Sequence, residues 1–432
     1  MQGFIDIYGR VLGRKVPENS MEILVKGATA CPGKTVGKPV VVITAKDAHL
    51  VQKGDILVSP MTTPDCVPAM KRAAAIVTER GGRTCHAAIV ARELGIPCIV
   101  GAIGAVDILA KHDLITVDAT RGEVFAGAVD LEVPSETEVS TEQRTTKTKV
   151  YVNLADPDSA ARVAELSVDG VGLLRAEFIA AHIGEHPRFM LDAGRGSEYT
   201  QKLADGIRTF AKAFYPRPVV YRTTDFKTNE YRNLIGGEHV EEQEENPMIG
   251  FRGAFRHLAD PEIFRLETEA IRLVQQELDN VRVMIPFIRT PEELQHIKIA
   301  LAENGVASDS IWIMVEVPST VILLDAFIDL GIGGVSIGTN DLTQLILGID
   351  RDNAKYAHVF DERNPAVMWC LERIITTCKR RNISISMCGQ TPSFYPDLTA
   401  KLVEWGITSV SVSPDMIDQT RRIVADAESK LR

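Results

Sequence analysis

The chain has 432 residues, of which 45% are hydrophobic and 25% charged, and its formal net charge is −10. That length predicts two or three domains, and the negative charge argues against nucleic acid or an anionic membrane as the main partner. We expect a cytoplasmic protein without membrane association, because no apolar run approaches the roughly 20 residues of a membrane span and the N-terminus lacks the pattern of a signal peptide.

The first 22 residues show no clear period, and we interpret them as an N-terminal connector. The segment Ala28–Thr35 then satisfies a loose P-loop pattern for nucleotide binding. A P-loop needs a strand before it and a helix after it, so that backbone amides converge on the phosphates. Here Gly37, Pro39 and the apolar run Val40–Ile43 predict a strand instead. We therefore expect no nucleotide site at this segment.

Residues 23–125 are predicted to form one compact domain of short strands and small helices. Further strands are expected at Gly54–Pro60, Ile96–Val100, Leu114–Asp118 and Gly122–Phe125, and a short helix at Pro64–Arg72.

His86 stands at the start of a predicted helix in this domain, after a turn with two glycines and before the small residues Ala87–Leu94. Backbone amides and the helix dipole favour an anion at such a helix start. A phosphoryl group on His86 would be held there by amides, by the Thr84 hydroxyl and by Arg83. The histidine is therefore a candidate covalent nucleophile, and the ordinary alternative is a loop histidine that only caps a turn.

Residues 126–149 are rich in Glu, Ser, Thr, Pro and Lys and predict an exposed linker. In residues 150–432, strand-like and helical runs alternate eight times, which matches a (β/α)₈ barrel with its active site at the carboxyl ends of the strands. The predicted strands are Val150–Leu154, Val171–Leu174, Pro218–Arg222, Val281–Pro286, Ile311–Val315, Gly334–Ile337, Ile383–Met387 and Ser409–Val412. The predicted helices include Pro261–Leu278, Pro291–Asn304, Ser319–Leu330, Pro365–Arg381 and Asp415–Leu431. We interpret the acidic run Glu241–Glu245 as a solvated loop.

Polar residues stand at one end of these apolar strands, where they are costly unless they face solvent or a ligand. The strand-end residues are Arg175, Arg222, Glu316, Gly338, Thr339, Asn340, Asp341 and Cys388, and the long loop after the third strand adds Arg252. Arginines bind carboxylate and phosphoryl oxygens through paired hydrogen bonds, and Glu316 and Asp341 suit Mg²⁺, which prefers oxygen ligands. A surface ion pair is the alternative for any single residue. Together they predict a site for an anionic keto acid.

The seven cysteines are odd in number and include no CxxC pair, which indicates reduced thiols rather than disulfides or a zinc site. Cys388 is the thiol placed at a strand end. A role in proton exchange would require a pKa brought towards neutrality by nearby positive charge. The other cysteines are interpreted as small buried residues, with Cys85 left open because it adjoins His86.

The block Thr78–Pro97 closely resembles the phosphohistidine segment of phosphoenolpyruvate (PEP) synthase, also called pyruvate, water dikinase, in the family of PEP-utilising enzymes. The resemblance extends from about Ile23 to the C-terminus. It rests on the blocks Gly172–Phe178, Thr224–Tyr231, Asn246–Gly253, Val315–Ser319, Ser336–Gln344, Asp350–Asp352, Phe360–Asn364 and Cys388–Gln390. It implies an α/β protein in which a swivelling β/β/α phosphohistidine domain precedes a (β/α)₈ barrel of the TIM type that binds PEP and pyruvate.

Carried over position by position, the resemblance implies that His86 is transiently phosphorylated and that Cys388 is the proton donor. The implied substrate-binding residues are Arg175, Arg222, Glu316, Gly338, Thr339, Asn340, Asp341 and Arg351. Glu316 and Asp341 would hold Mg²⁺, which together with the arginines stabilises the enolate formed when pyruvate loses a methyl proton. The implied overall reaction converts ATP, pyruvate and water to AMP, PEP and phosphate.

PEP synthase begins with a large nucleotide-binding domain that moves phosphate from ATP to the histidine, and nothing upstream of Ile23 could form it. The resemblance therefore implies that ATP acts through a missing domain or a separate nucleotide-binding subunit, and a homodimer through the barrel is a further expectation. Two alternatives stay open. One is a PEP–protein phosphotransferase like enzyme I of the sugar transport system, which would need a carrier-docking helical domain that we do not find. The other is a non-catalytic, PEP-responsive phosphocarrier or regulatory protein, and the argument against it is that His86, Glu316, Asp341 and Cys388 are all intact.

Overall fold

The computed structural model describes residues 22–63, 66–82, 85–129, 145–306, 311–350, 359–389 and 391–431. The chain forms two compact units, one within residues 1–62, 68–83 and 96–141, the other within residues 63–67, 84–95 and 142–432. Most of the predicted connector 1–22 and of the predicted linker 126–149 lies outside the described residues. The domain boundaries read from the sequence therefore stay a proposal.

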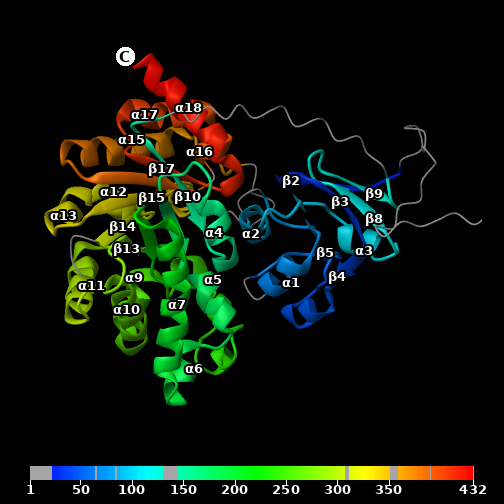
Figure 1. Ribbon diagram of the computed structural model, residues 1–432, viewed down its shortest axis with the longest axis horizontal. Helices are drawn as coiled ribbons and strands as arrows, with labels where there is room; N and C mark the ends of the chain where they lie inside the picture. The colour runs from blue at the N-terminus through cyan, green and yellow to red at the C-terminus, as the bar shows by residue number, and fades with distance from the viewer. Residues whose placement is uncertain are drawn as a thin grey trace, which may run out of the picture. The chain divides into compact units, whose positions relative to one another are not determined.

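The first unit is built from two small β-sheets (Figure 1). One is antiparallel with the strand order β1-β9-β8-β3, and the other has the order β2-β7-β6-β5-β4, in which β4 to β7 run parallel. The strands are β1 (Ile23–Lys26), β2 (Ala28–Cys31), β3 (Lys34–Gly37), β4 (Pro39–Val41), β5 (Ile56–Ser59), β6 (Ala75–Thr78), β7 (Cys98–Val100), β8 (Ile115–Asp118) and β9 (Glu123–Ala126). The helical segments in the same part of the sequence are a 3₁₀ turn at Ala45–Leu50, α1 (Val67–Arg72), α2 (His86–Leu94) and α3 (Ala105–Leu109), of which α2 is grouped with the second unit.

The parallel strands of this unit are continuous apolar runs because both of their faces are buried. All residues of β5 and β6 are buried, and Ile56, Val58 and Val77 belong to one core with residues of β8. The P-loop-like segment forms β2 and β3, so the helix that a P-loop requires does not come after it. The prediction that a strand rather than a helix follows this segment is confirmed.

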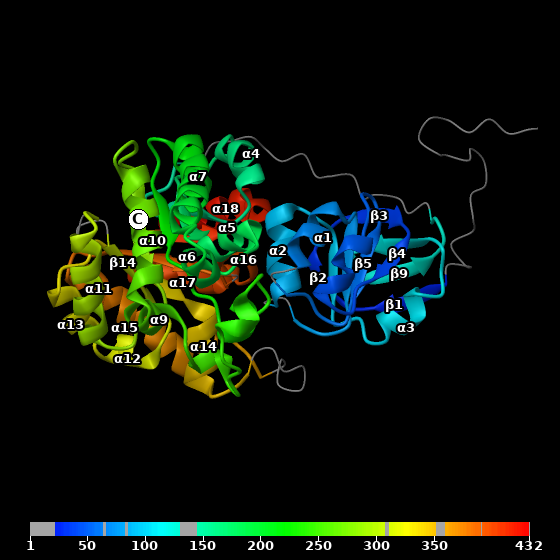
Figure 2. The same cartoon turned by 90° about the horizontal axis from the view of Figure 1, so that it is seen from below.

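The second unit contains a closed barrel of eight parallel strands, in which each strand pairs with its neighbours in chain order and β10 pairs with β17 (Figures 1 and 2). The strands are β10 (Lys149–Leu154), β11 (Val171–Arg175), β12 (Val219–Arg222), β13 (Val281–Ile285), β14 (Ile311–Val315), β15 (Gly334–Gly338), β16 (Ser384–Cys388) and β17 (Ser409–Val412). The predicted α/β class and the eight-stranded barrel are confirmed, with each strand end within one residue of the prediction. Arg175, Arg222, Gly338 and Cys388 are the last residues of their strands.

Helices surround the barrel (Figure 2). They are α4 (Ala160–Ala164), α5 (Ala176–Ile183), α6 (Pro187–Asp192), α7 (Gly196–Phe214), α8 (Thr228–Tyr231), α9 (Gly253–Ala259), α10 (Pro261–Gln275), α11 (Pro291–Glu303), α12 (Pro318–Ile322), α13 (Leu324–Asp329), α14 (Thr339–Leu347), α15 (Pro365–Arg380), α16 (Thr391–Phe394), α17 (Pro396–Trp405) and α18 (Ile417–Lys430). Short 3₁₀ turns lie at Pro157–Ser159, Gly237–His239, Pro247–Ile249 and Pro414–Met416.

Local sequence signals explain where these helices begin. α10, α11 and α15 each start with proline, and the residues before them, Asp260, Thr290 and Asn364, accept a hydrogen bond from a backbone N–H of the first turn. The single helix predicted at Ser319–Leu330 was wrong: the structure has α12 and α13, separated at Leu323. Consecutive β-branched residues at positions 320–322 weaken the helix there.

Two layers of apolar side chains stabilise the barrel. Leu173, Val220, Met284 and Met314 form a cluster with Cys388 inside it, while a larger core joins the outward-facing strand residues to the helices. Within the described ranges, no helix combines the length and the apolar character needed to cross a bilayer.

Candidate active site

A cavity of about 90 Å³ opens at the carboxyl ends of the barrel strands. Its lining residues are Leu173, Arg175, Arg222, Met314, Glu316, Gly338, Thr339, Asn340, Asp341, Cys388 and Gly389. The structure thus brings together every barrel residue to which the resemblance gave a site role, except Arg351, which lies outside the described residues. A cavity this small suits a substrate of a few carbon atoms rather than a nucleotide.

Strand register explains this convergence. Arg175 pairs with Arg222 across β11 and β12, and Gly338 pairs with Cys388 across β15 and β16. Because the strands are parallel, residues that end neighbouring strands meet at one mouth. Within the described part of the chain, the buried Oδ1 atom of Asn340 has no hydrogen-bond partner, which leaves it available to a ligand in the cavity.

Three buried carboxylates lie at this mouth. They belong to Asp225, Glu316 and Asp341. Each residue has one carboxylate oxygen that lies within 4.8 Å of such an oxygen in the other two. Burial, followed by the negative charges of Asp341 and Asp225, raises the pKa of Glu316 to about 8. Carboxylates packed this closely need a cation nearby, and hard oxygen donors of this kind fit Mg²⁺.

Asp225 is a member of this group that the sequence reasoning did not assign. It stands inside the block Thr224–Tyr231, three residues after the end of β12, which is the signal that could have identified it. Burial alone would raise the pKa of Asp225, but the Arg252 guanidinium, with help from Arg222, holds it below its usual value.

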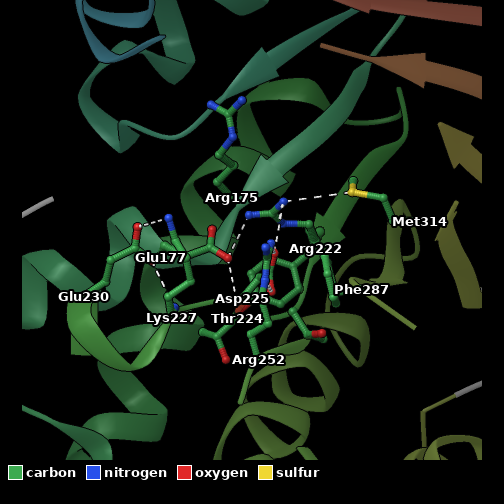
Figure 3. Close-up of polar contacts among 12 residues, drawn as sticks. Arg175, Glu177, Arg222, Thr224, Asp225, Lys227, Glu230, Arg252, Phe287 and Met314 are labelled. Atoms are coloured by element: carbon green, nitrogen blue, oxygen red, sulfur yellow. Dashed lines mark hydrogen bonds and ion pairs between the residues drawn. The ribbon is translucent and has the colours of Figure 1, made fainter. Parts of the chain in front are cut away.

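Two arginines, Arg222 and Arg252, lie beside Asp225 (Figure 3). Arg252 donates from Nε and Nη2 to the two carboxylate oxygens of Asp225, at 3.0 and 2.6 Å, and from Nη2 to Asp341 at 3.0 Å. Arg222 donates to Glu177 at 2.9 Å, and the same Glu177 oxygen accepts the backbone N–H of Asp225 at 2.6 Å. Glu177 thereby fixes both an arginine and a carboxylate of the site.

Arg175 is a further predicted arginine, and it lines the cavity. It forms an ion pair with Glu93 of α2, a helix that is grouped with the barrel unit. In Figure 3 its side chain points away from the group around Asp225. The guanidinium groups of Arg175 and Arg222 therefore serve different parts of the mouth.

Phe287 has a backbone conformation that is rare for a residue with a side chain, with φ of +44°. Its N–H donates to the Glu316 carboxylate at 2.7 Å, and its ring centroid lies 4.0 Å from the Arg252 guanidinium carbon. Local strain of this kind persists only where the surroundings impose it. Phe287 thus orients a carboxylate and supports an arginine, a role that no pattern in the sequence indicates.

Gly253 allows this packing because it has φ of +58° and a Cβ there would lie 2.6 Å from Phe287 Cβ. We expect Gly253→Ala to lower the free energy of unfolding by about 2 kcal/mol or more, from backbone strain and the clash together. Gly348 is a matched control, because it has φ of +62° with nothing within 4 Å of the added Cβ. Urea unfolding of the two variants measures the difference, and equal losses would contradict the packing described.

Cys388 is buried, and its thiol accepts a hydrogen bond from Ser336 Oγ at 3.3 Å and donates to the Ile337 carbonyl at 3.5 Å. The expectation that positive charge brings its pKa towards neutrality was wrong. Burial raises the pKa of Cys388 and outweighs the lowering by Ser336, Arg222 and Arg175. The thiol is therefore protonated at pH 7, which is the form that a proton donor requires.

The acidic run Glu241–Glu245 was also interpreted wrongly as wholly solvated. Glu241 is buried, accepting from both Nη atoms of Arg256 at 2.5 and 2.9 Å and lying 3.0 Å from Nε2 of His186. Glu244 accepts the N–H of Phe251 at 2.9 Å. Both glutamates fix the loop that leads to Arg252.

His86 is the first residue of α2, as predicted. Burial, followed by the charges of Lys227 and Arg175, lowers its pKa to about 3, so the imidazole is neutral at pH 7. The neutral ring is the nucleophilic form. Arg83 and Thr84, which were expected to help hold a phosphoryl group, lie outside the described residues.

Comparison with known proteins identifies these domains. Residues 132–429 match the family described as PEP-utilising enzyme, PEP-binding domain, and residues 51–122 match PEP-utilising enzyme, mobile domain. The chain is 47% identical to a phosphoenolpyruvate synthase of Aeropyrum pernix over 96% of its length, 46% to one of Pyrococcus furiosus over 95% and 42% to one of Helicobacter pylori over 97%. It covers 53%, 52% and 55% of those proteins, so it spans about half the length of the curated relatives it matches. The chain therefore belongs to the PEP-utilising enzymes.

Proposed function

We propose that this protein is a phosphotransferase that interconverts pyruvate and PEP through a phosphohistidine at His86, as the PEP/pyruvate half of a PEP synthase. The observation that carries the proposal is the composition of the barrel mouth, where two arginines, the carboxyl groups of Glu316 and Asp341 and the Cys388 thiol line one small cavity. The similarity to phosphoenolpyruvate synthases over nearly the whole chain supports it.

Each part of the mouth has a task in this chemistry. Arg175 and Arg222 bind the carboxylate and phosphoryl oxygens of the substrate. Gly338, Thr339 and Asn340 complete the pocket, and Arg351 is assigned to the phosphoryl group by the resemblance alone. A side chain at position 338 would come within 2.7 Å of a Glu316 oxygen, so glycine is needed there.

In the direction of PEP breakdown, the bond between phosphorus and the enol oxygen breaks as the His86 imidazole takes the phosphoryl group. The enolate left behind receives a proton at its methylene carbon from the Cys388 thiol and becomes pyruvate. Glu316 and Asp341 would hold Mg²⁺, with Asp225 close enough to be a third oxygen ligand. When bound, the metal supplies positive charge that stabilises the enolate and the phosphoryl oxygens.

We further propose that ATP enters through a nucleotide-binding domain or subunit outside these 432 residues, as in the full reaction of a PEP synthase. A homodimer formed through the barrel and a cytoplasmic location belong to the same proposal.

The proposal predicts that the protein is phosphorylated by PEP and Mg²⁺ without any nucleotide. Intact-mass measurement should show one added phosphoryl group that is lost in acid and stable in base, as expected of phosphohistidine. His86→Ala should show none, whereas His112→Ala, which alters another histidine outside the cavity lining, should behave as wild type. An unmodified wild type, or equal modification of His86→Ala, would refute the assignment.

A further inference from the structure

Arg252 contacts two of the three carboxylates in the acidic group that would hold the metal. Its Nη2 atom donates to one oxygen of Asp225 at 2.6 Å, beside which Figure 3 shows it, and to one oxygen of Asp341 at 3.0 Å. All three side chains are at least nine-tenths buried. Two of the three carboxylates that fit a divalent cation therefore already share a cation supplied by the protein.

The guanidinium cannot give up its charge, because arginine stays protonated in proteins. Two fixed positive charges, those of Arg252 and Arg222, therefore lie beside the carboxyl groups of Asp225, Glu316 and Asp341. A divalent cation that enters this group must compete for the Asp341 oxygen and meets the repulsion of Arg252 at close range, where burial leaves little screening.

Arg252 is also held from several sides, so it cannot simply turn away. Its guanidinium lies over the Phe287 ring, and its Nη1 donates to the Met248 carbonyl at 3.0 Å. Its own carbonyl accepts from Arg289 at 3.5 Å. Asp341 lines the cavity, so an anion bound there would lie beside the carboxylate that Arg252 now contacts and could compete with it for the guanidinium.

We propose that Arg252 is an internal counter-cation that weakens divalent-metal binding to the substrate-free site and couples metal uptake to the arrival of an anionic substrate. The substrate takes over hydrogen bonds of Arg252, and Asp341 is then released to the metal. This inference rests on the proposed function in so far as Asp341 and Glu316 are metal ligands. It assigns Arg252 a role in ordering the binding events, whichever nucleophile later receives the phosphoryl group.

The test measures the binding of Mn²⁺ to the full chain, with and without oxalate. The electron paramagnetic resonance signal of the free ion reports how much Mn²⁺ remains unbound. Mn²⁺ replaces Mg²⁺ as a visible oxygen-seeking ion, and oxalate is a planar dianion that imitates the enolate of a keto acid. In wild type, oxalate should lower the dissociation constant for Mn²⁺ at least about tenfold. The reason is that the Arg252 guanidinium, a few ångströms away, repels the ion until oxalate binds. In Arg252→Gln, binding without oxalate should be tighter than in wild type by a similar factor, and oxalate should add little.

Arg188→Gln is the matched control, because Arg188 forms ion pairs with Asp260 and Glu262 and none of these residues lines the cavity. It should retain the wild-type response to oxalate. Arg252→Lys keeps the charge and should bind Mn²⁺ without oxalate as weakly as wild type, which separates the effect of charge from that of a disturbed fold.

Equal or weaker Mn²⁺ binding by Arg252→Gln in the absence of oxalate would overturn the inference. If that result came with normal phosphorylation of His86 by PEP, the proposed function would stand and only the role of Arg252 would fall. If wild type and all variants bound no Mn²⁺ even with oxalate, the metal site itself, and with it this inference, would be refuted.

Discussion

Cys388→Ala is expected to abolish the exchange of pyruvate methyl protons with deuterated solvent, a loss of at least about a hundredfold in rate. Cys388 is the cysteine that lines the cavity, and exchange requires its thiolate to take a methyl proton from pyruvate and its thiol to return a solvent deuteron to the same carbon. Among the described residues that line the cavity, no other thiol could deliver a proton to the substrate carbon. Proton nuclear magnetic resonance of pyruvate, with Mg²⁺ and enzyme present, tracks the exchange directly.

Cys378→Ala is the control for the loss of a buried thiol. Burial also raises the pKa of Cys378, to about 12, but this side chain belongs to α15 and packs in the outer core of the barrel. Its removal should leave exchange unchanged. Exchange retained in Cys388→Ala, at the wild-type rate, would show that another group moves the proton.

Glu316→Gln is expected to reduce Mg²⁺-dependent phosphorylation by PEP at least about a hundredfold, because it removes a charged oxygen ligand from the acidic group. The substitution also replaces the carboxylate that accepts the N–H of Phe287 with a side-chain amide, which can place either its oxygen or its NH₂ group towards that N–H. The measurement is the rate of phosphoprotein formation at several Mg²⁺ concentrations. The defect should shrink only partly as Mg²⁺ is raised.

Asp169→Asn is the matched carboxylate control, since Asp169 pairs with Arg421 at 2.9 Å and accepts the N–H of Val150, near the amino ends of the strands. It should lose some stability and keep the phosphorylation rate. A Glu316→Gln protein that is phosphorylated as fast as wild type, with the same dependence on Mg²⁺, would remove Glu316 from the site.

Much of this arrangement could be predicted from the sequence, because each parallel barrel strand is an apolar run and the residues at its carboxyl end face the mouth. Arg175, Glu316 and Cys388 could be placed together for that reason alone. The neighbours of each strand could also be inferred, because in the closed barrel the strands pair in the order in which they occur along the chain.

Other features depended on three-dimensional packing and could not be read from a pattern. The role of Phe287 could not be predicted, because no residue pattern around it indicates a positive φ at a residue other than glycine. Glu241 looked like one of several solvated acids until Arg256 and His186 were found beside it. The raised pKa of Cys388 was missed because the sequence shows nearby arginines but not how completely the thiol is buried.

The most direct test of the central claim is exchange of carbon label between pyruvate and PEP, with Mg²⁺ present and no nucleotide. If the phosphoryl group passes through His86, PEP phosphorylates the protein and releases pyruvate, and the phosphoprotein then returns the group to labelled pyruvate. Wild type should move label into PEP under these conditions, and His86→Ala should move none. No exchange by a wild-type protein that PEP does phosphorylate, or undiminished exchange in His86→Ala, would contradict the account.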